Sequence, residues 1–254
     1  RPSLGLKFLQ ATGWLEHFQE VAALIECPQD PEWHPEGDVF VHTCHCLDAL
    51  VKTPLYVKSD RLEQLTLMFA TLAHDFGKPQ TTVKKMKHGV ERWISPSHDQ
   101  NGIHLAEQFL LSIGAPHSII LHVQALVGNH MVSIQIRQRP TLPQVRRLAR
   151  KVMPATLDQL FTVIRADLAG RPPIPPDPSA GLLWLEEVAQ EETLHASAPK
   201  PLVMGRHLIE RGLKPGTHFK RILDELFELQ LDGAFTTLED ADPYIEKLCE
   251  GSVL

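Results

Sequence analysis

Disulfide-forming cysteine pairs and long hydrophobic runs are both lacking in this chain of 254 residues. Only four cysteines occur, none in a Cys-x-x-Cys pair, and Cys44 and Cys46 are too close to bridge comfortably within one helix. We therefore expect reduced thiols in a reducing compartment. No apolar run reaches the roughly 18–20 residues that cross a bilayer, and the first residues lack the pattern of a signal peptide. The sequence thus predicts a cytoplasmic protein with no membrane partner.

Acidic residues are absent between Glu107 and Asp158, although the formal net charge of the whole chain is −6. The overall charge argues against a general nucleic-acid binder. A solvated helix face is the usual explanation of a basic run, but the lack of balancing acids in this stretch weakens it. The stretch holds six cations that are candidates for binding nucleic acid or phosphate: Arg137, Arg139, Arg146, Arg147, Arg150 and Lys151.

Apolar residues recur every three or four positions along the chain, which predicts an all-α fold. The one candidate for a short β-hairpin lies near 83–94, with His88-Gly89 at the turn. The proline-rich segment 170–181 cannot continue a helix, so we expect it to be a linker. The predicted helices are 3–25, 38–52, 60–76, 100–113, 116–131, 141–152, 154–169, 179–193, 202–211 and 217–231.

Histidine is abundant, and its distribution indicates where to look for a functional site. Ten of the 14 histidines lie between His34 and His130. In that region, residues 67–73 are apolar on nearly every side of a predicted helix, which should therefore be buried, with His74 and Asp75 in its last turn. An ionised carboxylate is costly there, and the negative end of the helix dipole adds to the cost. A bound metal ion would remove both objections.

Asp167 and His42 are also predicted to lie on apolar helix faces. Leucine, valine and isoleucine stand seven, four and three residues before Asp167, which places its carboxylate on a buried face. A buried Asp paired with Arg165 or Arg171 explains Asp167 alone equally well. A lone His42 would more often be a core residue than a ligand. The whole set, one His, a His-Asp pair and a distant Asp, nevertheless suits a hard or borderline divalent ion.

The order of His42, the His74-Asp75 pair in HDFGK and Asp167 resembles the H…HD…D signature of HD-domain phosphohydrolases. Four segments resemble the body and HD region of bacterial CCA-adding tRNA nucleotidyltransferases: RPSLGLKFLQATGWLEHF, EWHPEGDVFVHT, SPSHDQNG and RADLAGRPP. The segment GRHLIERGLKPGTHFKRILDELFELQLDG resembles the helical tail of many such enzymes. The resemblance covers nearly the whole chain, and the tail motif is more specific than the HD dipeptide.

This resemblance implies an all-α HD-domain bundle with a C-terminal helical extension. It divides the chain into an N-terminal helical segment (1–30), an HD metal-binding domain (31–170) and a helical tail (171–254). One family feature is missing, because no Gly-Ser loop followed by an Asp-x-Asp pair, the mark of the polymerising head, occurs here. CCA addition by this chain alone is therefore not expected, whether it is part of such an enzyme or a stand-alone relative.

The resemblance also implies a metal site. His42, His74, Asp75 and Asp167 are expected to bind one divalent ion. Mg²⁺, Mn²⁺, Ni²⁺, Fe²⁺ and Zn²⁺ all tolerate histidine and carboxylate ligands, so the sequence leaves the identity of the metal open.

Three further residues are candidates for catalysis: Lys78, His98 and His130. Lys78 could contact a phosphate oxygen, or it could offset the dipole at the helix C-terminus. His98 and His130 could hold a second metal, as extra histidines do in some HD enzymes. Alternatively, His98 is exposed beside a helix cap and His130 is a core residue. Glu36 and His34 could support the metal ligands from outside.

The activity that this set implies is metal-assisted hydrolysis of a phosphoester. The resemblance points to nucleotides or RNA 3′ ends: 2′,3′-cyclic phosphates, 2′-nucleotides and simple phosphomonoesters. The alternative is a non-hydrolytic body and tail that binds tRNA, and a nucleotide-binding regulatory HD domain is a less favoured third. The expected partners are a nucleotide or phosphoester substrate and tRNA, and both a monomer and a homodimer agree with the sequence.

Overall fold

The computed structural model describes residues 1–250 and is helical apart from one two-stranded hairpin, which confirms the predicted all-α class. Among these residues, no helix is long and apolar enough to cross a membrane. The elements in chain order are α1 (Ser3–Ala11), η1 (Trp14–His17), α2 (Gln19–Ala22), α3 (Val39–Leu50), α4 (Pro54–Lys58), α5 (Arg61–Ala73), α6 (Lys78–Thr81), β1 (Val83–Lys87), β2 (Val90–Ile94), α7 (His98–Ser112), α8 (His117–Val127), α9 (Val132–Gln135), α10 (Leu142–Val152), α11 (Leu157–Ala169), α12 (Ala180–Glu191), α13 (Gly205–Glu210), α14 (His218–Leu231) and α15 (Asp242–Glu250).

The prediction of a single helix over 3–25 is wrong, because the chain divides there into α1, η1 and α2. Gly13 has a φ of 77°, in the left-handed region that glycine adopts without steric cost. This residue ends α1 and redirects the chain. The periodicity of apolar residues continues through the break, which is why the sequence pattern alone did not reveal it. The short helices α4, α6 and α9 and the terminal helix α15 were not predicted either.

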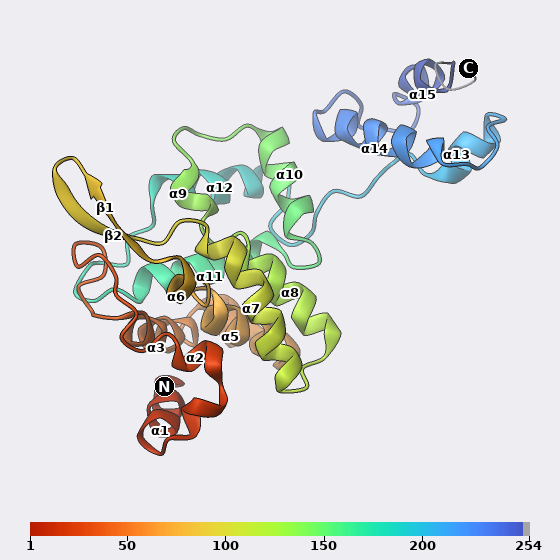
Figure 1. Cartoon of the computed structure of the whole chain (residues 1–254). Coiled ribbons are helices and arrows are strands. Elements are labelled where there is room, and N and C mark those ends of the chain that lie inside the picture. The colour runs from red at the N-terminus through yellow and green to blue at the C-terminus, as the bar shows by residue number, and fades with distance from the viewer. Residues whose placement is uncertain (251–254) are drawn as a thin grey trace.

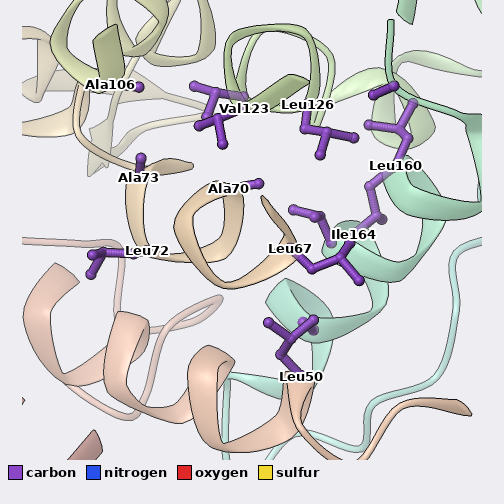
Figure 2. Packing of buried hydrophobic residues seen from close by; sticks show 14 of the residues in the cluster. Leu50, Leu67, Ala70, Leu72, Ala73, Ala106, Val123, Leu126, Leu160 and Ile164 are labelled. Atoms are coloured by element: carbon purple, nitrogen blue, oxygen red, sulfur yellow. The ribbon is translucent and has the colours of Figure 1, made fainter. Parts of the chain in front are cut away.

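Helix α5 is the central element of the larger core. Its N-terminus is capped by Asp60, whose side chain accepts a hydrogen bond from the Glu63 amide. The helix packs against α3, α7, α8 and α11, and Leu67, Ala70 and Ala73 are completely buried among them (Figure 2). A helix that is apolar on all sides must be surrounded in this way. The result is that the residues that follow α5 also lie in the interior.

The hairpin forms where the sequence predicted it. Strands β1 and β2 pair antiparallel, with Val83 opposite Ile94 and Lys87 opposite Val90. His88 and Gly89 at the turn have φ values of 51° and 79°, as the two central residues of a tight hairpin turn require. The hairpin projects from the helical body (Figure 1), and its side chains are mostly exposed.

Buried apolar residues form two separate clusters. The first runs from Leu15 to Leu194 and therefore includes α12, which follows the proline-rich segment and packs against α9, α10 and α11. The second runs from Val203 to Cys249 and is built by α13, α14 and α15. Figure 1 shows these three helices lying apart from the rest of the molecule. Of the three, α14 contacts α10.

Gly77 brings α5 and α7 unusually close together. An added Cβ at this position would overlap the carbonyl oxygen of His98 and come within 2.9 Å of the Gly102 nitrogen. Both are backbone atoms of α7, which cannot move as a flexible side chain can. The absence of a side chain at Gly77 therefore allows the turn after α5 to meet the start of α7.

We predict that Gly77→Ala lowers the free energy of unfolding by about 3 kcal/mol, the upper end of the usual cost of overpacking, because the new methyl group meets backbone. The melting temperature should then fall by roughly 6–12 °C. Gly5→Ala is the matched control: Gly5 lies within α1 with nothing within 4 Å of an added Cβ, so alanine there should be neutral or slightly stabilising. Thermal unfolding followed by circular dichroism measures both, and equal melting temperatures would contradict the proposed clash.

Candidate metal centre

Four histidine rings are fixed so that their Nε2 atoms point toward one another. In three of them Nδ1 lies 2.7 Å from a backbone carbonyl oxygen, and a carbonyl can only accept, so Nδ1 carries the hydrogen. When these rings are neutral, Nε2 is left with a free lone pair. Metal-binding histidines are typically held in this way. The pairs are His74 with Thr71, His98 with Ser95 and His130 with Val127.

The fourth ring, His42, is held by a carboxylate. Its Nδ1 lies 2.7 Å from Glu36 Oε1, which is also 2.9 Å from His34 Nδ1. Burial would raise the pKa of Glu36, but the hydrogen bonds from His34 and His42 lower it to about 2. Glu36 is therefore ionised at neutral pH and orients the His42 ring. The two residues expected to support the ligands are thus next to His42, and Glu36 touches it directly.

Asp167, on α11, reaches the His42 ring on α3. Its Oδ1 lies 3.0 Å from His42 Nε2 and 4.0 Å from His74 Nε2. Burial would raise the pKa of Asp167, but His42 and His74 lower it well below its usual range. The alternative of an arginine partner does not hold: Arg165 pairs with Glu186, and Arg171 donates to the Leu168 carbonyl.

Asp75 lies in the turn immediately after α5 and is 1% exposed. Its two oxygens face different groups. Oδ2 lies 3.2 Å from His74 Nε2 and 3.8 Å from His42 Nε2, whereas Oδ1 lies 3.3 Å from His98 Nε2. Lys78 Nζ is 2.8 Å from Oδ2 and also donates to Gln29 Oε1 at 2.7 Å. Burial would raise the pKa of Asp75, but the nearby His74 and Lys78 lower it well below the ordinary value.

His98 and His130 are both buried, and their Nε2 atoms lie 3.2 Å apart. Burial, together with the neighbouring His98 and His74, lowers the pKa of His130 to about 4. His130 is therefore neutral at pH 7. Two imidazole lone pairs facing each other repel unless a proton or a cation lies between them. The expectation of an exposed His98 is not met, since only 5% of the residue is accessible.

The structure groups the ligand atoms into three clusters, each with its members within 4.8 Å of one another, and one of them is the set of His34, Glu36 and His42 described above. The other two lie next to each other. The first consists of His42, Cys46, His74 and Asp167, and the second of Asp75, His98 and His130. Sequence reasoning missed Cys46, although its spacing was a usable signal. It follows His42 by four residues, which places both side chains on the same face of α3.

This donor set fits a divalent cation. His74 Nε2 is buried and has no hydrogen-bond partner among residues 1–250, although a buried polar atom normally has one. Imidazole nitrogens and carboxylate oxygens are the ligands that ions such as Zn²⁺, Fe²⁺ and Mn²⁺ accept. The side chains that could hold an ion are His42, His74 and Asp167, with Asp75 between the two clusters. The site reaches solvent beside Asp167, whose side chain is 22% exposed, and His34, at 18%.

The six basic residues between Glu107 and Asp158 differ in whether they form ion pairs. Four of them form ion pairs with acids that follow later in the chain. Arg137 and Lys151 are exposed and take part in none of the ion pairs found in residues 1–250. The paired residues are Arg139 with Glu187 and Glu191, Arg146 with Glu192, Arg147 with Glu228 and Asp232, and Arg150 with Glu228 and Asp224.

Comparison with known proteins finds relatives that are named as CCA proteins or as a tRNA nucleotidyltransferase. It is 32% identical over 157 residues to the multifunctional CCA protein of Tolumonas auensis, covering 60% of this chain and 34% of that protein. It is 28% identical over 216 residues to the A-adding tRNA nucleotidyltransferase of Deinococcus radiodurans, covering 84% and 47%. A third relative, the multifunctional CCA protein of Pasteurella multocida, is 27% identical over 174 residues, covering 67% and 39%.

The aligned part thus spans about a third to a half of these relatives. No family model matches the sequence, and no solved structure matches it either. The chain is homologous to part of the CCA-adding tRNA nucleotidyltransferases.

Proposed function

We propose that this chain is a divalent-metal-dependent phosphohydrolase that acts on phosphoesters of nucleotides or RNA 3′ ends. The substrates would be 2′,3′-cyclic phosphates, 2′-nucleotides and simple phosphomonoesters. The observation that carries the proposal is the convergence of four anchored imidazole rings on two carboxylates, the buried Asp75 and the partly buried Asp167. A protein that needed only a stable core would gain nothing by collecting these groups, because each ionised carboxylate costs free energy to bury.

When bound, a divalent ion would polarise a phosphoryl oxygen and lower the pKa of a water molecule, which supplies a nucleophile at neutral pH. Glu36 holds the His42 ring in place for this task. Lys78, whose ammonium is already beside Asp75, offsets negative charge that develops on the phosphoryl oxygens. His130 is neutral at pH 7, so its Nε2 can accept a proton or bind a cation but does not bring positive charge itself.

A polar hollow of about 320 Å³ offers room for part of a substrate next to these histidines. Ser97 and Asn129, the chain neighbours of His98 and His130, line it together with the acidic Asp99. Lys151 lines the same hollow and is one of the two unpaired cations of the basic stretch. RNA 3′ ends are favoured as substrates because the relatives named above carry the names of enzymes that add nucleotides to tRNA.

We predict that Asp75→Ala abolishes metal binding and turnover together. For the wild type, excess Mn²⁺ or Zn²⁺ at about 100 times Kd should stabilise the fold by about 2.7 kcal/mol, which is a rise of roughly 5–11 °C in melting temperature. Asp75→Ala should show no rise and no hydrolysis of 2′,3′-cyclic nucleotides. The control is Asp177→Ala, an exposed carboxylate in the proline-rich segment, which should behave as the wild type. Hydrolysis of 2′,3′-cyclic nucleotides by Asp75→Ala would contradict the proposed metal-dependent activity.

A second candidate function is non-hydrolytic binding of tRNA by the body and tail. Two observations favour it: the homology to tRNA nucleotidyltransferases extends over 84% of the chain in one alignment, and Arg137 and Lys151 are exposed and have no acidic partner within the described residues. The other four arginines of the stretch are already neutralised by ion pairs. Of the six residues that were candidates for binding phosphate, only Arg137 and Lys151 therefore remain.

We predict that the double variant Arg137→Ala/Lys151→Ala weakens tRNA binding and reduces the slope of log K against log salt by about 1.8, or about 0.9 for each lost phosphate contact. Arg147→Ala is the matched control, because Glu228 and Asp232 already hold its guanidinium, and its slope should stay near that of the wild type. Gel-shift titrations over a range of salt concentrations measure both slopes. No tRNA binding by the wild type would exclude this second function.

A further inference from the structure

One group in the candidate metal centre has no role in the proposed hydrolysis: the thiol of Cys46. It is fully buried on α3, and its Sγ lies 3.3 Å from His42 Nε2. The backbone oxygen of Asp167 is 3.9 Å from the same sulfur. The ordinary explanation is a core cysteine whose S–H donates to the Asp167 backbone oxygen or to His42 Nε2. The nearer of these two atoms, His42 Nε2, can accept only while it carries neither a hydrogen nor an ion.

The structure assigns Cys46 as a sulfur ligand of the same divalent ion that His42, His74 and Asp167 would hold. This inference rests on the metal site proposed above. It adds that a thiolate at this position selects borderline ions such as Zn²⁺, Co²⁺ and Fe²⁺ over Mg²⁺. Thiolate is a soft ligand, whereas Mg²⁺ prefers carboxylate, carbonyl and water oxygens.

The spacing of the donor atoms agrees with a shared ion. Typical zinc bonds of 2.3 Å to sulfur and 2.0–2.1 Å to nitrogen place two ligands of one ion about 3.1 Å apart at a right angle and about 3.6 Å apart at a tetrahedral angle. The distance from Cys46 Sγ to His42 Nε2, 3.3 Å, lies within this range. All four ligand atoms of the cluster lie within 4.8 Å of one another.

A second and independent observation points to a ligand at this place. His74 Nε2 belongs to the same cluster, is buried, and has no hydrogen-bond partner among the residues that the structure describes. Asp75 Oδ2 lies 3.2 Å away but makes no hydrogen bond with it, and the ligand atoms of His74 and Cys46 lie within 4.8 Å of each other. An ion there would bind both atoms at once.

Because Gly170 has no side chain, there is room beside it for the Cys46 sulfur. An added Cβ at Gly170 would overlap Cys46 Sγ and come within 3.1 Å of His42 Cε1. The Gly170 carbonyl oxygen also lies 3.2 Å from His42 Nδ1. The segment that carries Asp167 is thus shaped to fit the thiol and the imidazole together.

Ligation by Cys46 has a simple proton balance. The thiol loses its proton, sulfur forms a bond to the ion, and the proton leaves to solvent. No bond in the protein is oxidised or reduced. Once His42 Nε2 binds the ion, the S–H keeps only the Asp167 backbone oxygen at 3.9 Å as an acceptor, and deprotonation with ligation gives the sulfur a closer partner.

The test is absorption spectroscopy of the full chain loaded with one equivalent of Co²⁺ without oxygen. Visible d–d bands report that Co²⁺ is bound in the site, and a near-ultraviolet charge-transfer band reports a cobalt–sulfur bond. We expect both in the wild type. Cys46→Ser should keep the d–d bands and lose the charge-transfer band. Its affinity for Zn²⁺ should fall at least about tenfold, because even residues that only orient ligands change metal affinity about 10- to 100-fold.

Cys44→Ser is the matched control. Cys44 is a buried cysteine of the same helix, two residues from His42 and therefore on another side of α3, and the variant should keep both bands. Cys46→Ala and circular dichroism serve in case serine disturbs folding. A wild type with d–d bands but no charge-transfer band, or a Cys46→Ser variant that retains it, overturns the sulfur ligand and leaves the metal site standing. Absence of the d–d bands from the wild type overturns the metal site itself, and the sulfur ligand with it.

Discussion

The orientation of imidazole rings by their outer nitrogen is the interaction on which the rest of the site depends. A carbonyl or carboxylate occupies Nδ1 of each ring, so Nε2 is turned inward and cannot be satisfied by its own backbone. The carbonyls come from residues three positions before each ring, such as Thr71 before His74. These three rings are therefore fixed by local helical or turn geometry, whereas His42 is held by the Glu36 side chain and by the distant Gly170 carbonyl.

Long-range packing is supplied by α5 and its neighbours. Residues 67–73 of α5 are apolar on nearly every side, so α3, α7, α8 and α11 surround the helix. Each of these four helices brings one or two donor groups to the C-terminal end of α5. The first cluster combines α3, α11 and the end of α5, and the second combines α7, the end of α8 and Asp75. Asp75 faces both, so this carboxylate joins two sets of ligands that come from different layers of the core.

The burial of the His74-Asp75 pair and the hairpin could be predicted from the sequence. The role of Cys46 and the ion pairs of the arginines could not, for physical reasons. The burial of His74 and Asp75 followed from an apolar helix of period 3.6, and the hairpin followed from His88-Gly89. Cys46 was missed because four cysteines without a paired spacing do not suggest a ligand, although its i+4 relation to His42 does. The arginines were expected to lack acidic partners because local charge counting does not detect acids 46 to 85 residues away, such as Glu192 and Asp232.

The ion pairs between α10 and the later helices have a consequence for the shape of the molecule. Arg147 and Arg150 link α10 to Glu228 and Asp232, and these side chains are 37–53% exposed. Exposed pairs contribute little each and are screened at physiological ionic strength, whereas each apolar cluster keeps its own burial. Besides these pairs, Arg146 donates to the Leu231 carbonyl across the same joint. We therefore expect added salt to loosen the joint between α10 and α13–α15 before it affects either core.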